Sequence, residues 1–557
     1  MFKPSRRTLL RAPVAAAGAG LLAACTGPGP GPSSGPGSGP GSGPGSGPGS
    51  GSQGGAGGAA FVPDGPSGYV NPSDPEVLAA ERARGAGPVR TYRLTAAEAT
   101  LDLGGRTVPS WAYDEALPGP LVRVTAGDVL DMTLANRLPA STTLHCHGVR
   151  LRCDMDGVPG LTQAAIRPGA DFRYRFTAAQ PGTYLLHSHV GMQADRALYA
   201  PLIVDDPREP LSYDKEWVVV LDDWLDGVDG STPDEVLDQL RPGASMEGGH
   251  MGMGPGRGGE PSRPATATPS PARRPAGPSR VLHTSHSRML HGEAGSVAHP
   301  FHLVNGRLPA HPEVFRCRPG DRVRLRIINA GAETAFRVAL GGHAMTVTHT
   351  DGYPVRHTRT DALLVGMAER YDVLVTVRDG VFPLVALAEG KQGSALAVLR
   401  TDKGSGNLPP ADVRPDELDG KTIPARRLVP DDSVALDDRE PDREMRIRIT
   451  GGMEKYDWGF DHQAYSVEQR RAVHAGERVR LTLINATEMW HPMHLHGHTF
   501  AITGLDGTGA RKDTAVVLPH RKLVLDFDAD NPGLWMLHCH NQYHSESGMM
   551  TVLGYRR

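Results

Sequence analysis

A cysteine near the end of the chain is followed by a histidine and a methionine at equal intervals. They are Cys539, His544 five residues later and Met549 ten residues later. Two imidazoles and a thiolate in one plane, with a weak thioether on the axis, are the ligands of a blue-copper site. These three residues supply one ligand of each type, and His491 in the run HPMHLHGHTF is the obvious source of the second imidazole. The pattern predicts a copper site at which single electrons enter the protein.

The two histidines that flank the cysteine indicate a second metal site. Side chains alternate in direction along a strand, so His538 and His540 point away from the side to which Cys539 points. They must therefore bind other metal ions. One histidine pair of this kind is also compatible with a zinc site or with chance, but four pairs together with the cysteine tail favour copper. The other three pairs are His145 with His147, His187 with His189, and His494 with His496.

With these motifs the chain resembles the multicopper oxidases, the family that includes laccases and bacterial cuprous oxidases. The resemblance implies four copper ions and a ligand at every family position. The implied type 1 ligands are His491, Cys539, His544 and Met549; the type 2 ligands are His145 and His494; and the type 3 ligands are His147, His187, His189, His496, His538 and His540. One departure is Cys146, where the family commonly has Trp, at a position expected to face away from the metal.

The resemblance also implies the reaction. A reducing substrate gives up electrons at the type 1 copper, through an exposed edge of His491 or His544, and Cys539 passes them to a trinuclear cluster that reduces dioxygen to water. Asp156 in CDMDGVPG is the candidate proton donor, because family members carry an acid at the corresponding position. The alternative role for Asp156 is that of a turn residue, since Asp-Gly is a strong turn signal.

A second acid, which bacterial relatives often place directly after the type 1 histidine, is absent from this chain. Ser545 occupies that position and Glu546 follows it. The second proton relay of the family is therefore in doubt here.

The substrate is open between a metal ion and an organic reductant. A Gly/Pro/Ser/Arg-rich segment at 241–280 contains thioethers and an imidazole, which favour cuprous ion: Met246, His250, Met251 and Met253. The alternative is a linker with incidental methionines. Further donors follow at His283, His286, Met289 and His291. We expect oxidation of Cu(I) or another metal ion such as Fe(II), with side activity on phenols. The alternatives are a laccase acting primarily on phenols or aromatic amines, and a non-catalytic copper-binding or electron-carrier protein.

The amino terminus has the features of an export signal. Residues 1–24 contain the twin-arginine pattern Ser5 to Leu10 and an apolar run too short and too rich in Ala and Gly to span a membrane. The run ends in LAAC, which resembles a lipobox with Cys25 as the lipidated residue; the alternative is an ordinary signal with a chance cysteine. Residues 25–60, almost wholly Gly, Pro and Ser, are predicted to be a disordered tether. We therefore expect a protein of the cell envelope, lipid-anchored on the outer face of the membrane or secreted.

A weak repeat predicts the elements that position these ligands. GDVLDMTLAN begins at Gly127, GDRVRLRIIN at Gly320 and GERVRLTLIN at Gly476. Alternating aliphatic residues are typical of half-buried strands. We therefore predict an all-β chain of three consecutive cupredoxin-like Greek-key sandwiches at 61–210, 211–405 and 406–557. Because the ligand pairs occur only in the first and third, those two domains must touch, and the second is predicted to be a spacer.

Composition excludes few function classes. The net charge of −3 gives no indication of nucleic acid binding. Of the five cysteines, those left after Cys25 and Cys539 are Cys146, Cys153 and Cys317, which allow one disulfide at most without indicating which. We expect a monomer that acts on a small substrate and dioxygen.

Overall fold

The computed structural model describes residues 68–241, 277–401, 404, 406–504 and 507–557. The predicted signal peptide, Cys25, the tether and the four donors Met246, His250, Met251 and Met253 lie outside these residues. The helices of the described part are short: α1 (Pro75–Ala83), α2 (Pro233–Leu240) and α3 (Gln542–Glu546), with 3-10 turns η1 (Cys153–Met155), η2 (Gly191–Asp195), η3 (Asp416–Asp419) and η4 (Ala425–Arg427). None of the described helices has the length and apolar character needed to cross a bilayer.

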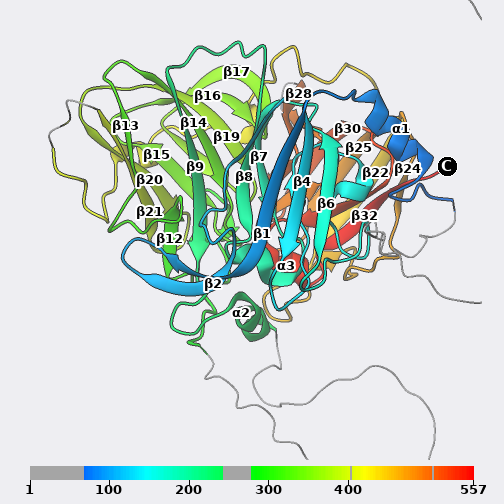
Figure 1. The fold of residues 1–557 in the computed structure, drawn as a ribbon, viewed down its shortest axis with the longest axis horizontal. Coiled ribbons are helices and arrows are strands. Elements are labelled where there is room, and N and C mark those ends of the chain that lie inside the picture. Colours follow the sequence, from blue (N-terminus) through cyan, green and yellow to red (C-terminus); the bar gives the residue numbers. More distant parts are fainter. Residues whose placement is uncertain (1–67, 242–276, 402–403, 405, 505–506) are drawn as a thin grey trace, which may run out of the picture. The chain divides into compact units, whose positions relative to one another are not determined.

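The first domain consists of two sheets with the strand orders β2-β1-β4-β6 and β3-β8-β7-β5. Its strands, drawn in blue to green in Figure 1, are β1 (Val89–Asp102), β2 (Thr107–Tyr113), β3 (Val122–Thr125), β4 (Val129–Asn136), β5 (His145–His147), β6 (Asp171–Thr177), β7 (Gly182–His187) and β8 (Tyr199–Asp205). Strand β5 begins and ends at a predicted metal ligand, and β7 ends at another.

The second domain has the orders β12-β9-β14-β19-β16-β17 and β13-β21-β20-β15-β18. Its strands are β9 (Lys215–Trp224), β12 (Phe301–Val304), β13 (Val314–Cys317), β14 (Arg322–Asn329), β15 (Phe336–Leu340), β16 (Met345–Thr350), β17 (Tyr353–Thr360), β18 (Ala362–Val365), β19 (Arg370–Thr376), β20 (Val381–Ala388) and β21 (Ser394–Thr401). A small hairpin of β10 (His286–Ser287) and β11 (Gly292–Glu293) precedes β12.

The third domain has the orders β23-β22-β25-β30-β27-β28 and β24-β32-β31-β26-β29. Its strands are β22 (Arg443–Thr450), β23 (Gly459–Phe460), β24 (Arg471–Val473), β25 (Arg478–Asn485), β26 (His491–Leu495), β27 (Phe500–Gly504), β28 (Gly507–Lys512), β29 (Thr514–Val517), β30 (Lys522–Asp528), β31 (Leu534–Cys539) and β32 (Met550–Tyr555). The predicted all-β fold of three cupredoxin-like sandwiches is confirmed.

The repeated sequence forms the same strand in each domain. Strands β4, β14 and β25 each pair with one parallel and one antiparallel neighbour. Each ends in an asparagine, Asn136, Asn329 or Asn485, whose Nδ2 donates to two backbone carbonyls and whose Oδ1 accepts the backbone N–H two residues later. The asparagine fixes the loop that follows the strand, and in the first and third domains this loop leads to β5 and β26.

The hydrophobic cores show how the domains associate. Leu130 and Leu134 of the first domain belong to the same buried cluster as Leu481 and Leu483 of the third. Most of the second domain packs around a cluster of its own. The first and third domains therefore meet through buried apolar side chains, as the division of the ligand pairs between them requires.

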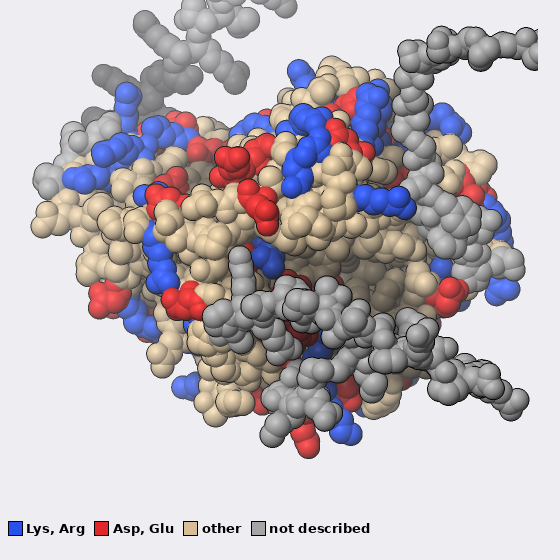
Figure 2. Space-filling view, turned by 60° about the horizontal axis from the view of Figure 1, so that its bottom comes forward, with Lys and Arg blue, Asp and Glu red and all other residues tan. Residues whose placement is uncertain are grey.

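On the face displayed in Figure 2, basic and acidic side chains are intermixed.

Candidate metal centre

Strand pairing sets the histidine pairs side by side. In the first domain β5 pairs antiparallel with β7, and His145 lies opposite His187. In the third, β26 pairs antiparallel with β31, and His494 lies opposite His538. Because side chains on one face of a strand recur every second residue, each pair of strands directs its histidines to one face.

The predicted type 2 and type 3 ligands come together in groups that combine the two domains. Within each group the potential ligand atoms lie within 4.8 Å of one another and are largely buried. The groups are His145, His147 and His494; His147, His187 and His540; and His189, His496 and His538.

In several of these histidine rings one nitrogen is hydrogen-bonded, which leaves the other nitrogen available to a metal ion. The Nδ1–H groups of His145, His187, His494 and His538 donate to the backbone carbonyls of Asp156, Ser188, Asp513 and Cys539 at 2.7, 2.8, 2.9 and 2.9 Å. The Nε2 atoms of His145, His187, His189 and His494 are buried without a partner, and those of His496 and His538 face each other at 3.1 Å. His147 is reversed, with Nε2 directed at Asp513 and Nδ1 unpartnered.

Burial and the neighbouring imidazoles lower the pKa of seven of the predicted ligands, which are His147, His187, His189, His494, His496, His538 and His540. The pKa of His187 falls to about 3 and that of His538 to about 4, chiefly through desolvation. These seven rings are therefore neutral, which is the form that binds metals. Converging lone pairs on neutral, buried imidazoles are unfavourable without a cation between them, and imidazole nitrogen is a donor that suits copper.

The predicted type 1 residues form a separate buried group. The Nδ1 atoms of His491 and His544 lie 3.7 and 3.8 Å from the Cys539 sulfur. Met549 is buried, its carbonyl accepts the backbone N–H of Cys539 at 3.1 Å, and its N–H donates to the His544 carbonyl at 3.1 Å. Burial raises the pKa of the Cys539 thiol, so a thiolate there requires a bound cation. One thiol and two imidazoles, with a buried methionine whose backbone is hydrogen-bonded to Cys539 and His544, fit the donor set of a blue-copper site.

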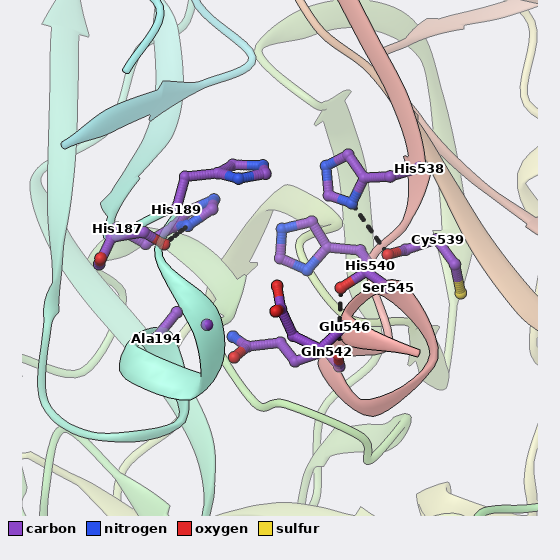
Figure 3. Close-up of a pocket in the computed structure, with 11 residues that line it drawn as sticks. His187, His189, Ala194, His538, Cys539, His540, Gln542, Ser545 and Glu546 are labelled. Atoms are coloured by element: carbon purple, nitrogen blue, oxygen red, sulfur yellow. Dashed lines mark hydrogen bonds between the residues drawn. The ribbon is translucent and has the colours of Figure 1, made fainter. Parts of the chain in front are cut away.

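Alternation along β31 separates the two sites. In Figure 3 the rings of His538 and His540 lie on the side of His187 and His189, whereas the Cys539 sulfur points away from them. Three consecutive residues thus join the two groups through the backbone.

The prediction that His491 or His544 has an exposed edge is wrong. Both residues are 0% exposed. The Trp458 ring covers them, with its centroid 4.2 Å from that of His544 and 5.4 Å from that of His491, and the His491 Nε2 is hydrogen-bonded to the Thr487 hydroxyl at 2.8 Å. Electrons from a substrate must therefore cross a layer of protein.

Asp156 lies at the histidine groups, as its candidate role requires. Its Oδ2 accepts the Nδ1–H of His496 at 2.9 Å, and its Oδ1 lies 3.3 Å from the Nδ1 of His145 without a hydrogen-bond partner. Sequence reasoning missed a second aspartate, Asp513, whose Oδ1 lies 3.1 Å from the Nε2 of His147 and 3.6 Å from the Nδ1 of His494. No metal-ligand spacing marks Asp513 in the run ARKDTAVV, because it acts on the ligands of two distant motifs.

A pocket leads to the histidines between α3 and η2 (Figure 3). The residues that line it include His187, His189, His538, His540, Gln542 and Glu546. Burial raises the pKa of Glu546 to about 7. Position 545 is a serine, but the carboxyl-bearing Glu546, one residue later, lines the same pocket.

Within the described residues Cys146, Cys153 and Cys317 are buried and form no disulfide with one another. Cys146 packs in the hydrophobic core that the first and third domains share. This placement agrees with the expectation that it faces away from the metal.

Three cupredoxin-like sandwiches that bring together one cysteine-containing group and several histidine groups have the fold and the donor sets of a copper protein. Family models described as multicopper oxidase match residues 95–209, 281–404 and 438–556. The chain belongs to the multicopper oxidase family. It is a copper-dependent oxidoreductase that uses dioxygen as electron acceptor.

Individual relatives agree with this assignment. The chain is 46% identical to Multicopper oxidase MmcO of Mycobacterium tuberculosis over 86% of its own length and 89% of that protein. It is 28% identical to the Copper resistance protein A homolog of Pseudomonas syringae pv. tomato over 82% of its length and 91% of that protein. The solved structure of Fet3p, described as a multicopper oxidase that functions in iron import, has the same fold, with a TM-score of 0.67 and 22% identity over 84% of this chain and 90% of that one.

Proposed function

We propose that the chain binds four copper ions and oxidises cuprous ion, with dioxygen as the electron acceptor. The type 1 ion is held by His491, Cys539, His544 and Met549; the type 2 ion by His145 and His494; and the type 3 pair by His147, His187, His189, His496, His538 and His540. Copper at these positions supplies one-electron oxidation of the substrate and four-electron reduction of dioxygen to water. The donor sets and the unpartnered nitrogens described above support this assignment.

The chain's own residues connect and serve the two sites. Cys539 links them covalently, because its neighbours His538 and His540 lie in the histidine groups. Asp156 is proposed to hold and deliver a proton at Oδ1, the oxygen that lies 3.3 Å from the Nδ1 of His145 and has no hydrogen-bond partner. The carbonyls that accept the Nδ1–H groups fix the orientation of the rings.

The covering of the type 1 residues is the observation that favours a metal ion as substrate. His491 and His544 are buried, so a bulky phenol has no ring edge to contact. The hairpin β10–β11 lies against the loop before His491, where the Glu293 N–H donates to the Glu488 carbonyl at 3.2 Å. This hairpin carries the soft and borderline donors His286, Met289 and His291, of which the two histidines are exposed.

Two further points support a role in copper handling. Relatives named copper resistance protein A are 28% identical to this chain over about four fifths of its length. The segment 241–280 adds Met246, His250, Met251 and Met253 as donors for cuprous ion.

Export through residues 1–24 and an anchor at Cys25 would place this activity at the cell envelope, and Cys25→Ser is then expected to release the protein into the soluble fraction. Retention of that variant in the membrane fraction would remove the anchor from the proposal.

Oxygen consumption by the copper-loaded protein tests the substrate. We expect Cu(I) to be oxidised faster than Fe(II) or a substituted phenol, with or without added free copper. The double variant His286→Asn/Met289→Leu should slow Cu(I) oxidation and leave phenol oxidation unchanged. The matched control is His357→Asn, which alters an exposed histidine of the same domain on β17. Fast phenol turnover with slow Cu(I) oxidation would instead make the protein a laccase, and no turnover of any substrate would favour a copper carrier.

A further inference from the structure

A buried arginine of the second domain contacts an aspartate beside the histidine groups, although that domain supplies none of the proposed ligands. Arg370, the first residue of β19, is 0% exposed. Its NH1 and NH2 donate to the two carboxylate oxygens of Asp513 at 2.6 Å each. This is the bidentate geometry in which a guanidinium fixes both the position and the plane of a carboxylate.

The same guanidinium holds all three domains together at this point. Its Nε donates to the carbonyl of Thr183 on β7 at 3.0 Å, and NH1 also donates to the carbonyl of Ala368 in its own domain at 3.1 Å. Asp513 belongs to the third domain, and β7 of the first ends at His187. One side chain thus links a ligand-bearing strand of the first domain to an acid of the third.

The aspartate that Arg370 fixes determines the state of two ligand rings. A carboxylate oxygen can accept a hydrogen bond but cannot donate one. The Nε2 of His147 therefore carries the proton that faces Asp513 Oδ1, and the lone pair of that ring is on Nδ1. The backbone carbonyl of Asp513 accepts the Nδ1–H of His494 at 2.9 Å, which leaves the lone pair on Nε2. Asp513 therefore selects opposite tautomers for neighbouring rings, which stack with centroids 3.7 Å apart.

Further charges support the arginine on its other side. Asp351 lies 3.6 Å from Arg370 and 3.1 Å from Lys512, and Lys512 also lies 3.1 Å from Glu369. All of these groups are buried. A buried ionic network of this kind is costly to form and strongly destabilised when one member is lost, so its presence beside the histidines favours a positioning role over a purely stabilising one.

We propose that Arg370 is a positioning residue for the type 2 and type 3 copper ligands, acting through Asp513 on His147 and His494. The second domain then completes the trinuclear site in addition to spacing the other two. This inference rests on the ligand assignment proposed above. Outer partners of metal ligands commonly change metal affinity when they are altered.

The test compares Arg370→Lys with Arg326→Lys. Lysine keeps the charge but cannot form the two parallel bonds to Asp513. Arg326 is the matched control, because it is a buried arginine of the same domain that donates to Thr183 and Asp372 at 2.8 and 3.1 Å and does not contact Asp513 in the structure. Both variants are purified metal-free, their thermal unfolding is measured, and copper is added back. The readouts are total copper, the blue type 1 absorption and the type 2 electron paramagnetic resonance signal.

We expect Arg370→Lys to retain the type 1 absorption and to bind copper at the type 2 position about tenfold more weakly. Arg326→Lys should keep the wild-type ratio of type 2 to type 1 signals, whatever its melting temperature. Proportional loss of both signals in Arg370→Lys, an unchanged ratio, or the same selective loss in Arg326→Lys would overturn the inference. Absence of both signals from the wild-type protein would instead overturn the ligand assignment itself.

Discussion

Asp156 and Asp513 make equivalent contacts from two different domains. Each carboxylate contacts one histidine of the first domain and one of the third: Asp156 contacts His145 and His496, and Asp513 contacts His147 and His494. They differ in what holds them. Asp513 is clamped by Arg370, whereas one oxygen of Asp156 has no hydrogen-bond partner. The clamped acid suits positioning, and the other suits proton transfer.

Asp156→Asn is expected to slow oxygen consumption roughly 10²-fold, since removal of a general acid costs at least that much. The loss should be largest at high pH, where other proton sources are scarce, and total copper should stay at the wild-type level. Steady-state rates across pH and metal analysis measure both quantities. Asp154→Asn is the control, because Asp154 pairs with Arg152 at 2.6 Å and contacts no ligand in the structure. Unchanged rates in Asp156→Asn would dismiss the proton role.

Gly148→Ala is expected to disturb the trinuclear ligands. Gly148 follows His147 directly, has φ +83°, and a Cβ there would lie 2.4 Å from an Arg370 nitrogen and 2.5 Å from an Asp513 oxygen. The strained backbone and the clash together should cost at least about 2 kcal/mol of unfolding free energy. Chemical denaturation of the metal-free protein measures this cost. Gly160→Ala is a control with a similar φ of +74° and open space around its Cβ. Equal losses of unfolding free energy in the two variants would show that backbone strain alone causes the loss, and would contradict the clash with Arg370 and Asp513.

Met549→Leu should raise the reduction potential of the type 1 site. The thioether donates electron density that favours the oxidised ion, and leucine removes this donor at nearly constant volume. The swap should cost less than about 1.5 kcal/mol of stability. Redox titration of the blue absorption checks the potential, with Met550→Leu as control for a neighbouring methionine. A potential equal to that of the wild type would remove Met549 from the proposed ligand set.

Acidification should destabilise the metal-free protein. In the folded state the pKa values of His187 and His491 are about 3 and that of His538 about 4, whereas an unfolded histidine titrates near 6.5. As the pH falls below about 6.5, the unfolded chain binds protons that the folded chain excludes, so stability falls by about 1 kcal/mol per histidine between pH 6.5 and 5.5. Denaturant titrations over this range measure the slope. Copper should raise the stability without reducing this slope, because the folded rings exclude protons in this pH range with or without the metal; a flat profile of the metal-free protein would contradict the neutral cluster.

Deletion of residues 245–254 is expected to weaken Cu(I) oxidation and to spare phenol oxidation, because this segment carries the thioethers Met246, Met251 and Met253. Oxygen uptake with each substrate measures the two activities. Replacement of the segment by an equally long Gly/Ser sequence separates loss of donors from loss of length. Equal loss of both activities would remove the segment from the proposed function.

The sequence alone was sufficient for the fold class and for the list of metal-ligand candidates, because both depend on local patterns. The repeat ending in Asn136, Asn329 and Asn485 predicted three related sandwiches, and His-x-His spacing predicted the direction of each side chain. Asp513, Arg370 and the covering of His491 by Trp458 were not predicted. Each arises from contacts between segments far apart in the chain, and no spacing within one motif reports such contacts.

The buried cluster common to the first and third domains has a consequence for how the protein is made. Leu134 and Leu483 belong to that cluster although they lie on opposite sides of the second domain in the sequence. The first domain therefore leaves the ribosome with apolar surface that only the end of the chain covers, and contacts of such long range form slowly. We expect the emerging chain to depend on protection from aggregation until synthesis is complete, and a truncation before β25 to yield insoluble protein as well as protein without copper.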